Sequence, residues 1–460
     1  MITQNIPGNN SNNQSAAWRV LGSSTFAFTI CFAVWMMFAI LGIPLKKQLH
    51  LTDAEFGLVA AMPVLTGSLA RVPLGIWTDR FGGRIVFFLI MLATVVPIWL
   101  VSYATQFWQF LVLGLFVGFA GSSFSVGTPY VARWFPKSRQ GLAMGIFGAG
   151  NSGAALNKFV APVLIVAAGT WTIVPKVYAV AMLVTAFGFL LLSSSNPAHR
   201  VVGGTRAGNQ LKVLGDPRVL RYAQYYSVVF GGYVGLSLWM PQYYVNQYGF
   251  GIEAAAFLAA CFSLPGGVLR AMGGWLSDRF GAYRTTWAVM WVALAGFFVL
   301  SYPSTDFVIH SAHGPIAFHL GLGPVFYTVI MFIVGVAMAV GKASVFKFIG
   351  DSYTDNIGAV SGVVGLAGGL GGFVLPILFG LLVDLTGVRT TCFMLMFGAT
   401  AVSLLFMHFS FRPEALATAR AAEERAAQQK EARVHEAQAA QAAQAAQAAD
   451  AVHAQEALAD

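Results

Sequence analysis

Apolar residues gather in long runs that short polar breaks separate. A helix needs about 20 mostly apolar residues to cross a bilayer, and helices can span lipid because they satisfy their own backbone hydrogen bonds. The runs cover residues 20–43, 54–78, 85–103, 107–131, 141–167, 174–195, 222–246, 253–277, 284–302, 322–347, 357–385 and 389–411. This pattern predicts an all-α integral membrane protein with twelve transmembrane helices. The first run is long enough to span and lacks a cleavage signature, so we expect a retained helix and not a signal peptide.

The composition agrees with a membrane protein and excludes a soluble enzyme. Of the 460 residues 57% are hydrophobic and 10% are charged, whereas soluble domains carry about 25% charged residues. The three cysteines lie in apolar runs without the spacing of metal ligands, so we expect no metal and no cofactor. A haem-binding membrane anchor is disfavoured because only His319 and His408 come near a span, and a sensor would need a signalling domain.

Basic residues are concentrated in alternate loops. Loops after even-numbered runs hold Arg80, Arg84, Arg133, Lys137, Arg139, Arg200, Arg206, Lys212, Arg218, Arg221, Arg279 and Arg284, whereas the others hold Lys46, Lys47, Lys176 and Arg389. Since cytoplasmic loops collect Lys and Arg, both termini are expected in the cytoplasm, with the chain in the bacterial inner membrane.

The two halves of the chain repeat one another. The segment RVPLGIWTDRFGGR at 71–84 recurs as RAMGGWLSDRFGAYR at 270–284, and a glycine-rich block at 141–162 recurs at 358–376. Parallel repeats predict two pseudo-symmetric six-helix bundles that rock about a midplane substrate site. The glycines expected to let helices slide past one another are Gly145, Gly148, Gly153, Gly362, Gly365 and Gly369.

The repeat also sets the expected domain boundaries. They are a polar N-terminal tail at 1–17, bundles at 18–195 and 222–412, a cytoplasmic linker at 196–221 and an Ala/Gln-rich tail at 413–460, helical or disordered.

The loop after the second run resembles the loop motif of the major facilitator superfamily. It holds Asp79, Arg80 and Arg84 among glycines, and a second copy with Asp278 and Arg279 follows the eighth run. The resemblance implies the major facilitator fold. We expect each aspartate to pair with loop arginines and to hold the cytoplasmic side of the halves together.

Charges that fall inside the runs are all positive. The ten acidic residues before the C-terminal tail lie in loops or at run ends, whereas Arg71, Lys158, Arg270, Lys342 and Lys347 lie within runs. Ionisable residues at the bilayer centre are costly and usually functional. With no carboxylate at that depth, the expected counter-ion is an anionic cargo.

The two arginines are the strongest candidates for binding that cargo. Each precedes its loop aspartate by eight residues, which places it about 12 Å above the cytoplasmic end, close to the midplane. Arginine binds a planar oxyanion through two parallel hydrogen bonds. Lys347 lies nearer the cytoplasmic end and is a weaker candidate because its side chain can extend to the surface.

The residues around these arginines resemble the nitrate/nitrite porter family of the major facilitator superfamily. The resemblance rests on GLAMGIFGAGNSGAALN, its glycine-rich partner and the symmetric arginines. FAVWMMFAILGIPLKKQLHL and VGKASVFKFI look most like the proton-coupled symporter branch. The family pattern assigns nitrate binding to Arg71, Arg270, Phe124, Tyr226, Phe230 and Asn151.

The resemblance implies import of nitrate together with protons, and nitrate/nitrite exchange stays open as the alternative. Nitrate carries no proton at physiological pH, so the coupling proton needs another site. A buried lysine beside other cations readily loses its proton, which makes Lys342, and after it Lys158, the proton-coupling candidates. The expected partners are nitrate or nitrite, protons and the lipid bilayer, with no nucleic acid, and the protein is expected to be a monomer.

Overall fold

The computed structural model describes residues 11–195, 215–353 and 357–410. Within them, ten helices are long and apolar enough to cross a membrane, and an eleventh results if Ile252–Val268 and Arg270–Phe280, which meet at a 48° bend, form one span. The remaining predicted run, 222–246, is helical as well, although its first part is polar. The twelve runs predicted from the sequence are therefore all helical.

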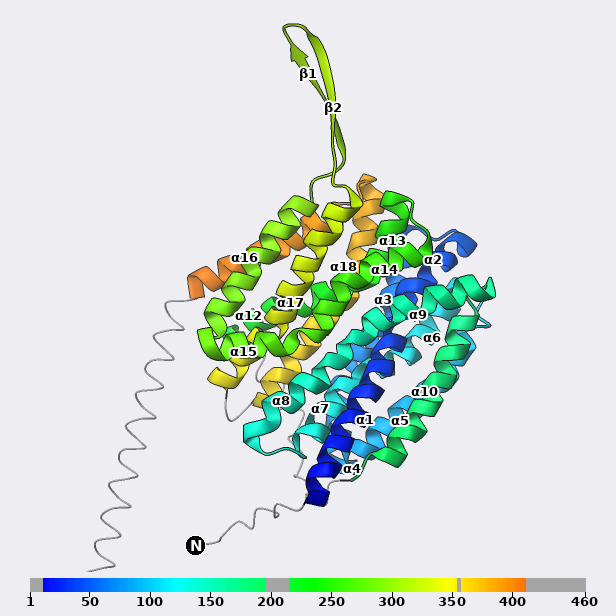
Figure 1. Cartoon of the computed structure of the whole chain (residues 1–460), viewed down its shortest axis with the longest axis vertical. Coiled ribbons are helices and arrows are strands. Elements are labelled where there is room, and N and C mark those ends of the chain that lie inside the picture. The colour runs from blue at the N-terminus through cyan, green and yellow to red at the C-terminus, as the bar shows by residue number, and fades with distance from the viewer. Residues whose placement is uncertain (1–10, 196–214, 354–356, 411–460) are drawn as a thin grey trace, which may run out of the picture. The chain divides into compact units, whose positions relative to one another are not determined.

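The first half of the chain forms six spans, several of them interrupted (Figure 1). They are α1 (Ser11–Trp35) with α2 (Phe38–Leu49), α3 (Asp53–Leu69) with α4 (Arg71–Phe81), α5 (Gly83–Val101), α6 (Phe107–Val117) with η1 (Gly118–Ser122) and α7 (Ser123–Ala132), α8 (Lys137–Gly148) with η2 (Ala149–Ser152) and α9 (Gly153–Ala168), and α10 (Ile173–Leu192). Helix α1 begins at Ser11, inside the segment 1–17 expected as a polar tail.

The second half repeats this plan and adds a hairpin. Its elements are α12 (Pro217–Tyr226) with the π-helical turn η4 (Ser227–Gly231) and α13 (Gly232–Tyr248), α14 (Ile252–Val268) with α15 (Arg270–Phe280), α16 (Ala282–Leu300), β1 (Thr305–Ser311), β2 (Gly314–Leu320), α17 (Pro324–Ser352), α18 (Ile357–Thr386) and the span Thr391–Ser410.

Helices pack mainly within their own half, and a few pairs join the halves. In the first half α10 packs on α5 and α1, and in the second α17 packs on α14 and α16. Helix α3 packs along α18, and α9 packs along α14, so these two pairs connect the first half to the second.

The hairpin is the one described element that the run pattern does not predict. Strands β1 and β2 pair antiparallel, with Thr305 opposite Leu320 and with the rings of Phe307 and Phe318 stacked 5.2 Å apart. Segment 303–321, between two predicted runs, is too polar to span, so the sequence indicates a loop there. The hairpin stands off one end of the helices, here called the hairpin end (Figure 1).

Local sequence explains why two spans break where they do. Pro73 has no N–H to bond the preceding turn, and α3 ends at Leu69 just before it. In α14, Pro265 is followed by Gly266 and Gly267, and the helix bends four residues after the proline. Each break falls directly before one of the two arginines predicted near the midplane, Arg71 and Arg270.

Several sequence expectations lie outside the described residues. These are most of the linker at 196–221, which is described only from residue 215, and the tail at 413–460. The side chain of Asp79 is outside them as well.

Candidate functional site

The two midplane arginines occupy equivalent places in the two halves. Arg71 is the first residue of α4 and Arg270 is the first residue of α15, each directly after a break in its span. Both side chains line one small pocket between the halves, as the sequence repeat predicts. Two guanidinium groups from opposite halves therefore face a common space.

Three further spans that line this pocket also depart from regular α-helix beside it. Gly121 lies in the 3₁₀ turn η1, Asn151 in the 3₁₀ turn η2, and Phe230 in the π-helical turn η4. Such irregular turns are frequent at functional sites, because they re-aim side chains and free backbone groups. Together with the two breaks before the arginines, interruptions in five different spans meet at this pocket.

The pocket is narrow in this conformation. Its lining consists of Phe28, Phe32, Arg71, Gly121, Phe124, Asn151, Tyr226, Phe230 and Arg270. The space open to the centre of a water molecule is about 10 Å³, and one water needs roughly 10–15 Å³ by that measure. An anion of several atoms therefore needs small side-chain movements to enter.

Aromatic rings flank both guanidinium groups. The Cζ atom of Arg71 lies 5.3 Å from the centre of the Phe230 ring, and that of Arg270 lies 5.2 Å from the Phe124 ring. Tyr226 and Phe230 stack 5.1 Å apart with their planes 10° from parallel. Residues four apart lie on one helical face, and these two rings stack there. Phe230 and Phe124 contact the two arginines through cation–π interactions.

Hydrogen-bond donors in the pocket are left without partners. Nη1 of Arg71 donates to the backbone oxygen of Gly365 across the interface at 2.9 Å. In the described part of the chain, Nε of Arg71 and Nδ2 of Asn151 are buried and have no hydrogen-bond partner. Because buried donors are almost always bonded, these two point to a ligand with acceptor oxygens.

The two lysines predicted to couple protons are fully buried and do not line this pocket. Lys158 is 1% exposed and its Nζ donates to Ser263 Oγ at 3.0 Å. Lys342 is 0% exposed, donates to the backbone oxygen of Gly266, and lies 3.5 Å from the centre of the Tyr233 ring. Among the described residues neither lysine forms an ion pair.

Lys347 differs from the other cations that the sequence places within spans. Its Nζ lies 3.1 Å from Asp278 and 3.3 Å from Asp351, and its side chain is 38% exposed. The expectation that all five cations lack a protein carboxylate is therefore wrong for Lys347. The expected pairing of Asp278 with a loop arginine is also wrong, because Asp278 pairs with Lys347 of α17.

Three arginines of the repeated loops make other contacts within the described residues. Arg84 donates to the backbone oxygen of Leu190 at 2.6 Å. The Cζ atoms of Arg80 and Arg279 lie over the rings of their chain neighbours Phe81 and Phe280, at 5.2 Å and 5.5 Å.

The paired glycines occupy different surroundings. A Cβ on Gly145 or Gly148 would approach Ala271 or Arg270, one on Gly365 would approach Arg71, and one on Gly369 would lie 2.1 Å from Ser68 Oγ. These four therefore face the opposite half. Gly153 faces the backbone of α1 in its own half, and Gly362 has no atom within 4 Å.

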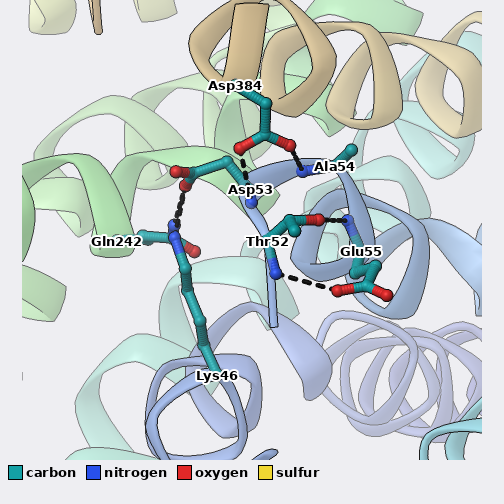
Figure 2. Close-up of polar contacts among 7 residues, drawn as sticks. All are labelled: Lys46, Thr52, Asp53, Ala54, Glu55, Gln242 and Asp384. Atoms are coloured by element: carbon teal, nitrogen blue, oxygen red, sulfur yellow. Dashed lines mark hydrogen bonds and ion pairs between the residues drawn. The ribbon is translucent and has the colours of Figure 1, made fainter. Parts of the chain in front are cut away.

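A polar network joins the halves where α3 begins and α18 ends (Figure 2), on the side of the bundle where the hairpin stands (Figure 1). Asp384 at the end of α18 accepts from the backbone nitrogens of Asp53 and Ala54 at 3.0 and 2.8 Å. Asp53 also accepts from Lys46 Nζ at 2.5 Å and from Gln242 Nε2 at 2.6 Å. Since α18 and α13 belong to the second half, the contacts from Asp384 and Gln242 connect the second half to α3.

Three aromatic residues in or beside the pocket were not predicted from the sequence. Phe28 and Phe32 of α1 line it, and Arg270 lies 5.6 Å from the ring of Phe346. Phe346 follows Lys342 by four residues, so helical spacing could have placed it on the same face. Phe28 and Phe32 have the same spacing but no distinguishing motif.

A larger cavity than this pocket lies elsewhere in the described residues. It is an apolar groove of about 580 Å³ along α15, α16 and α17, lined by residues such as Leu276, Val292 and Phe332. Such a lining suits lipid chains and offers an anion few partners.

Residues 24–374 match the family model described as Major Facilitator Superfamily. The chain belongs to this superfamily. A crystal structure of a bacterial homologue of the human lysosomal transporter Spinster, inward-facing and occupied, matches with a TM-score of 0.66 at 14% identity, covering 86% of this chain and 97% of that one. This likeness confirms the predicted major facilitator fold of two six-helix bundles.

Similar proteins indicate the family within the superfamily to which this chain belongs. A probable nitrate/nitrite antiporter of Thermus thermophilus, NarK1, is 41% identical over 405 residues, which cover 85% of this chain and 91% of the relative. A nitrite extrusion protein of Bacillus subtilis (strain 168) is 28% identical over 388 residues, which cover 84% and 93%. These matches confirm the resemblance to the nitrate/nitrite porter family. This major facilitator protein is a membrane transporter and not an enzyme.

Proposed function

We propose that this transporter imports nitrate together with protons by alternating access, with the anion held between Arg71 and Arg270. The names of its relatives, a nitrate/nitrite antiporter and a nitrite extrusion protein, support this class of cargo. The hairpin end is proposed to face outward and both termini to face the cytoplasm of a bacterial cell, in keeping with the distribution of basic loop residues. The transporter is proposed to act as a monomer.

The proposal rests on one observation: hydrogen-bond donors without partners among the described residues and planar aromatic rings line the same pocket. Among the described residues, neither Nε of Arg71 nor Nδ2 of Asn151, both buried there, has a hydrogen-bond partner. Arginine binds planar oxyanions through its planar fork, and nitrate is planar, singly charged and weakly hydrated. Stacked Tyr226 and Phe230 add an apolar face that suits such an ion better than a strongly hydrated phosphate.

Binding of the anion also explains why the two halves close only when cargo is present. Arg71 and Arg270 carry like charges and act on one another electrostatically, and their repulsion in a water-poor pocket opposes closing of the halves. An anion between them removes that repulsion. The halves therefore close readily around cargo and poorly without it.

Import requires coupling because the cell interior is negative. Moving one negative charge inward costs about 2.3 kcal/mol per 100 mV, so more than one proton per nitrate makes import electrically favourable. Arg270 is the charged group that acts on Lys342. An anion on Arg270 weakens that repulsion, so nitrate and a proton on Lys342 favour one another's binding.

Exchange of nitrate for nitrite is the second candidate. The printed name of the Thermus thermophilus relative favours it, and two arginines without any titrating group would suffice for it. The two buried lysines, Lys158 and Lys342, favour the proton-coupled mode, since anion exchange requires no proton-binding residue.

Transport by the purified protein in sealed vesicles separates the two modes. Nitrate entry driven by an inward proton gradient, with no internal nitrite or nitrate, supports symport. Entry that requires internal anion and ignores the gradient supports exchange and overturns proton coupling. Vesicles containing Arg270→Ala protein serve as the control for anion binding.

A further inference from the structure

We infer that Tyr233 is a positioning residue of proton coupling, which holds the Lys342 ammonium group and is itself held by helix α14. This inference rests on the proposed coupling at Lys342. The ring of Tyr233 belongs to α13, whereas Lys342 belongs to α17, so the contact depends on how the helices pack. The sequence alone does not predict a contact between Tyr233 and Lys342.

The contact between the two residues is unusually close. Nζ of Lys342 lies 3.5 Å from the centre of the Tyr233 ring, well within the roughly 6 Å at which a ring attracts a cation. Both side chains are 0% exposed. The ring face stabilises the charged ammonium form and gives little to the neutral amine.

Three contacts fix the ring in that place. The Tyr233 hydroxyl donates to the backbone oxygen of Ser263 at 2.7 Å, and Phe262 packs against the ring at 5.6 Å. A Cβ on Gly266 would lie 2.2 Å from a ring carbon, so only glycine leaves room for the ring there. Gly266 also provides the backbone oxygen that accepts from Lys342.

Helix α14 thereby accepts a hydrogen bond from each of the two buried lysines. Ser263 Oγ accepts from Lys158 of the first half, and Gly266 accepts from Lys342 of the second. Residues three apart lie on one face of a helix. The short segment 263–266 thus holds one cation from each half.

Other charged groups near Lys342 do not replace the ring. Arg270 of α15 is a like charge, and Lys158 of α9 reaches the same segment of α14. The carboxylates Asp278 and Asp351 pair with Lys347, more than one turn further along α17. Among the described residues, the Tyr233 ring and the Gly266 oxygen are therefore the groups that favour the proton on Lys342.

The test measures nitrate binding to the purified, full-length protein as a function of pH. If proton binding at Lys342 promotes nitrate binding, affinity falls as the pH rises through the titration of Lys342. Tyr233→Leu removes the ring and should move the midpoint to lower pH by about one unit. Tyr233→Phe keeps the ring and should stay within a few tenths of a unit of the wild type.

A second variant disturbs the contact between Tyr233 and Lys342 through Gly266, which faces the Tyr233 ring. Gly266→Ala should displace the ring and shift the midpoint in the same direction as Tyr233→Leu. Ser263→Ala removes the partner of Lys158 but keeps the backbone oxygen that holds Tyr233, so it should leave the midpoint unchanged.

The outcomes separate this inference from the proposed function. A wild-type midpoint that Tyr233→Leu and Gly266→Ala both leave unchanged overturns the positioning role while proton coupling stands. Nitrate affinity that is independent of pH in the wild type overturns the coupling and the inference together. Equal shifts in Tyr233→Phe and Tyr233→Leu would show that the hydroxyl matters and not the ring, which contradicts the inference.

Discussion

Asp384 caps the helix that Asp53 begins. Its carboxylate accepts from the backbone nitrogen of Asp53 at 3.0 Å, although the two residues lie in opposite halves of the chain (Figure 2). A carboxylate at a helix N-terminus satisfies free N–H groups and interacts favourably with the helix dipole. The contact therefore stabilises the state in which the hairpin end is closed.

Loss of this cap should shift the transporter toward the state open at the hairpin end. Asp384→Ala should lose about 0.5–2 kcal/mol of capping, which changes the ratio of open to closed protein about 2- to 30-fold. Asp384→Asn is the matched variant, because asparagine caps helices almost as well. The reporter is the reaction of Val383→Cys, a buried site nearby, with an impermeant thiol reagent in protein freed of its native cysteines. Equal labelling of the Ala and Asn variants would show that the cap does not hold this end closed.

Replacement of a midplane arginine by lysine should weaken nitrate binding although the charge remains. Arg71→Lys loses the planar fork and one charge-assisted hydrogen bond, worth about 1.5–3 kcal/mol, so the Kd should rise about 10- to 150-fold. Arg80→Lys provides the control, since Arg80 is exposed and lies against Phe81 outside the pocket. Isothermal titration of purified protein with nitrate measures both. An unchanged Kd for Arg71→Lys would exclude two-point binding of the anion.

Replacement of Lys342 by glutamine should abolish the pH dependence of nitrate uptake. Glutamine retains a donor for the Gly266 oxygen but cannot gain or lose a proton in this range. Lys347→Gln is the control on the same helix, because Lys347 is partly exposed and already paired with carboxylates. Uptake into vesicles is measured at several external pH values. A pH profile of Lys342→Gln that matches the wild type would remove Lys342 from the coupling mechanism.

Two of the repeated glycines should respond oppositely to alanine. A Cβ on Gly153 would lie 2.2 Å from the backbone oxygen of Thr29, so Gly153→Ala must push α9 and α1 apart and should lower the Tm by several degrees. Gly362 has no atom within 4 Å of such a Cβ, and alanine is favoured over glycine in helices by about 1 kcal/mol. Gly362→Ala should therefore keep or raise the Tm. Thermal unfolding of the detergent-solubilised variants checks both, and a similar loss in both would contradict the packing argument.

The β-hairpin should be dispensable for transport. Two-stranded hairpins are marginally stable in water, and several side chains of β1 and β2, Val308 and Ile316 among them, are more than half exposed. Replacement of residues 305–320 by a short Gly/Ser linker should leave vesicle uptake within about twofold of the wild type. A large loss of uptake with normal membrane insertion would assign the hairpin a part in the transport cycle.

The sequence by itself determined the membrane class, the twelve spans and the equivalence of Arg71 and Arg270. These features follow from the length of apolar runs and from an internal repeat, both of which are linear properties of the chain. The sequence also predicts the depth of the arginines, because the rise of a helix converts residue number into distance.

Only the tertiary structure decided which groups from different helices meet. It paired Lys347 with Asp278, placed the ring of Tyr233 against Lys342, and brought Asp384 to the first turn of α3. Helical periodicity fixes the face on which a side chain lies, but not which other helix packs against that face. Contacts between α13 and α17, or between α3 and α18, therefore depend on the packing of the whole bundle.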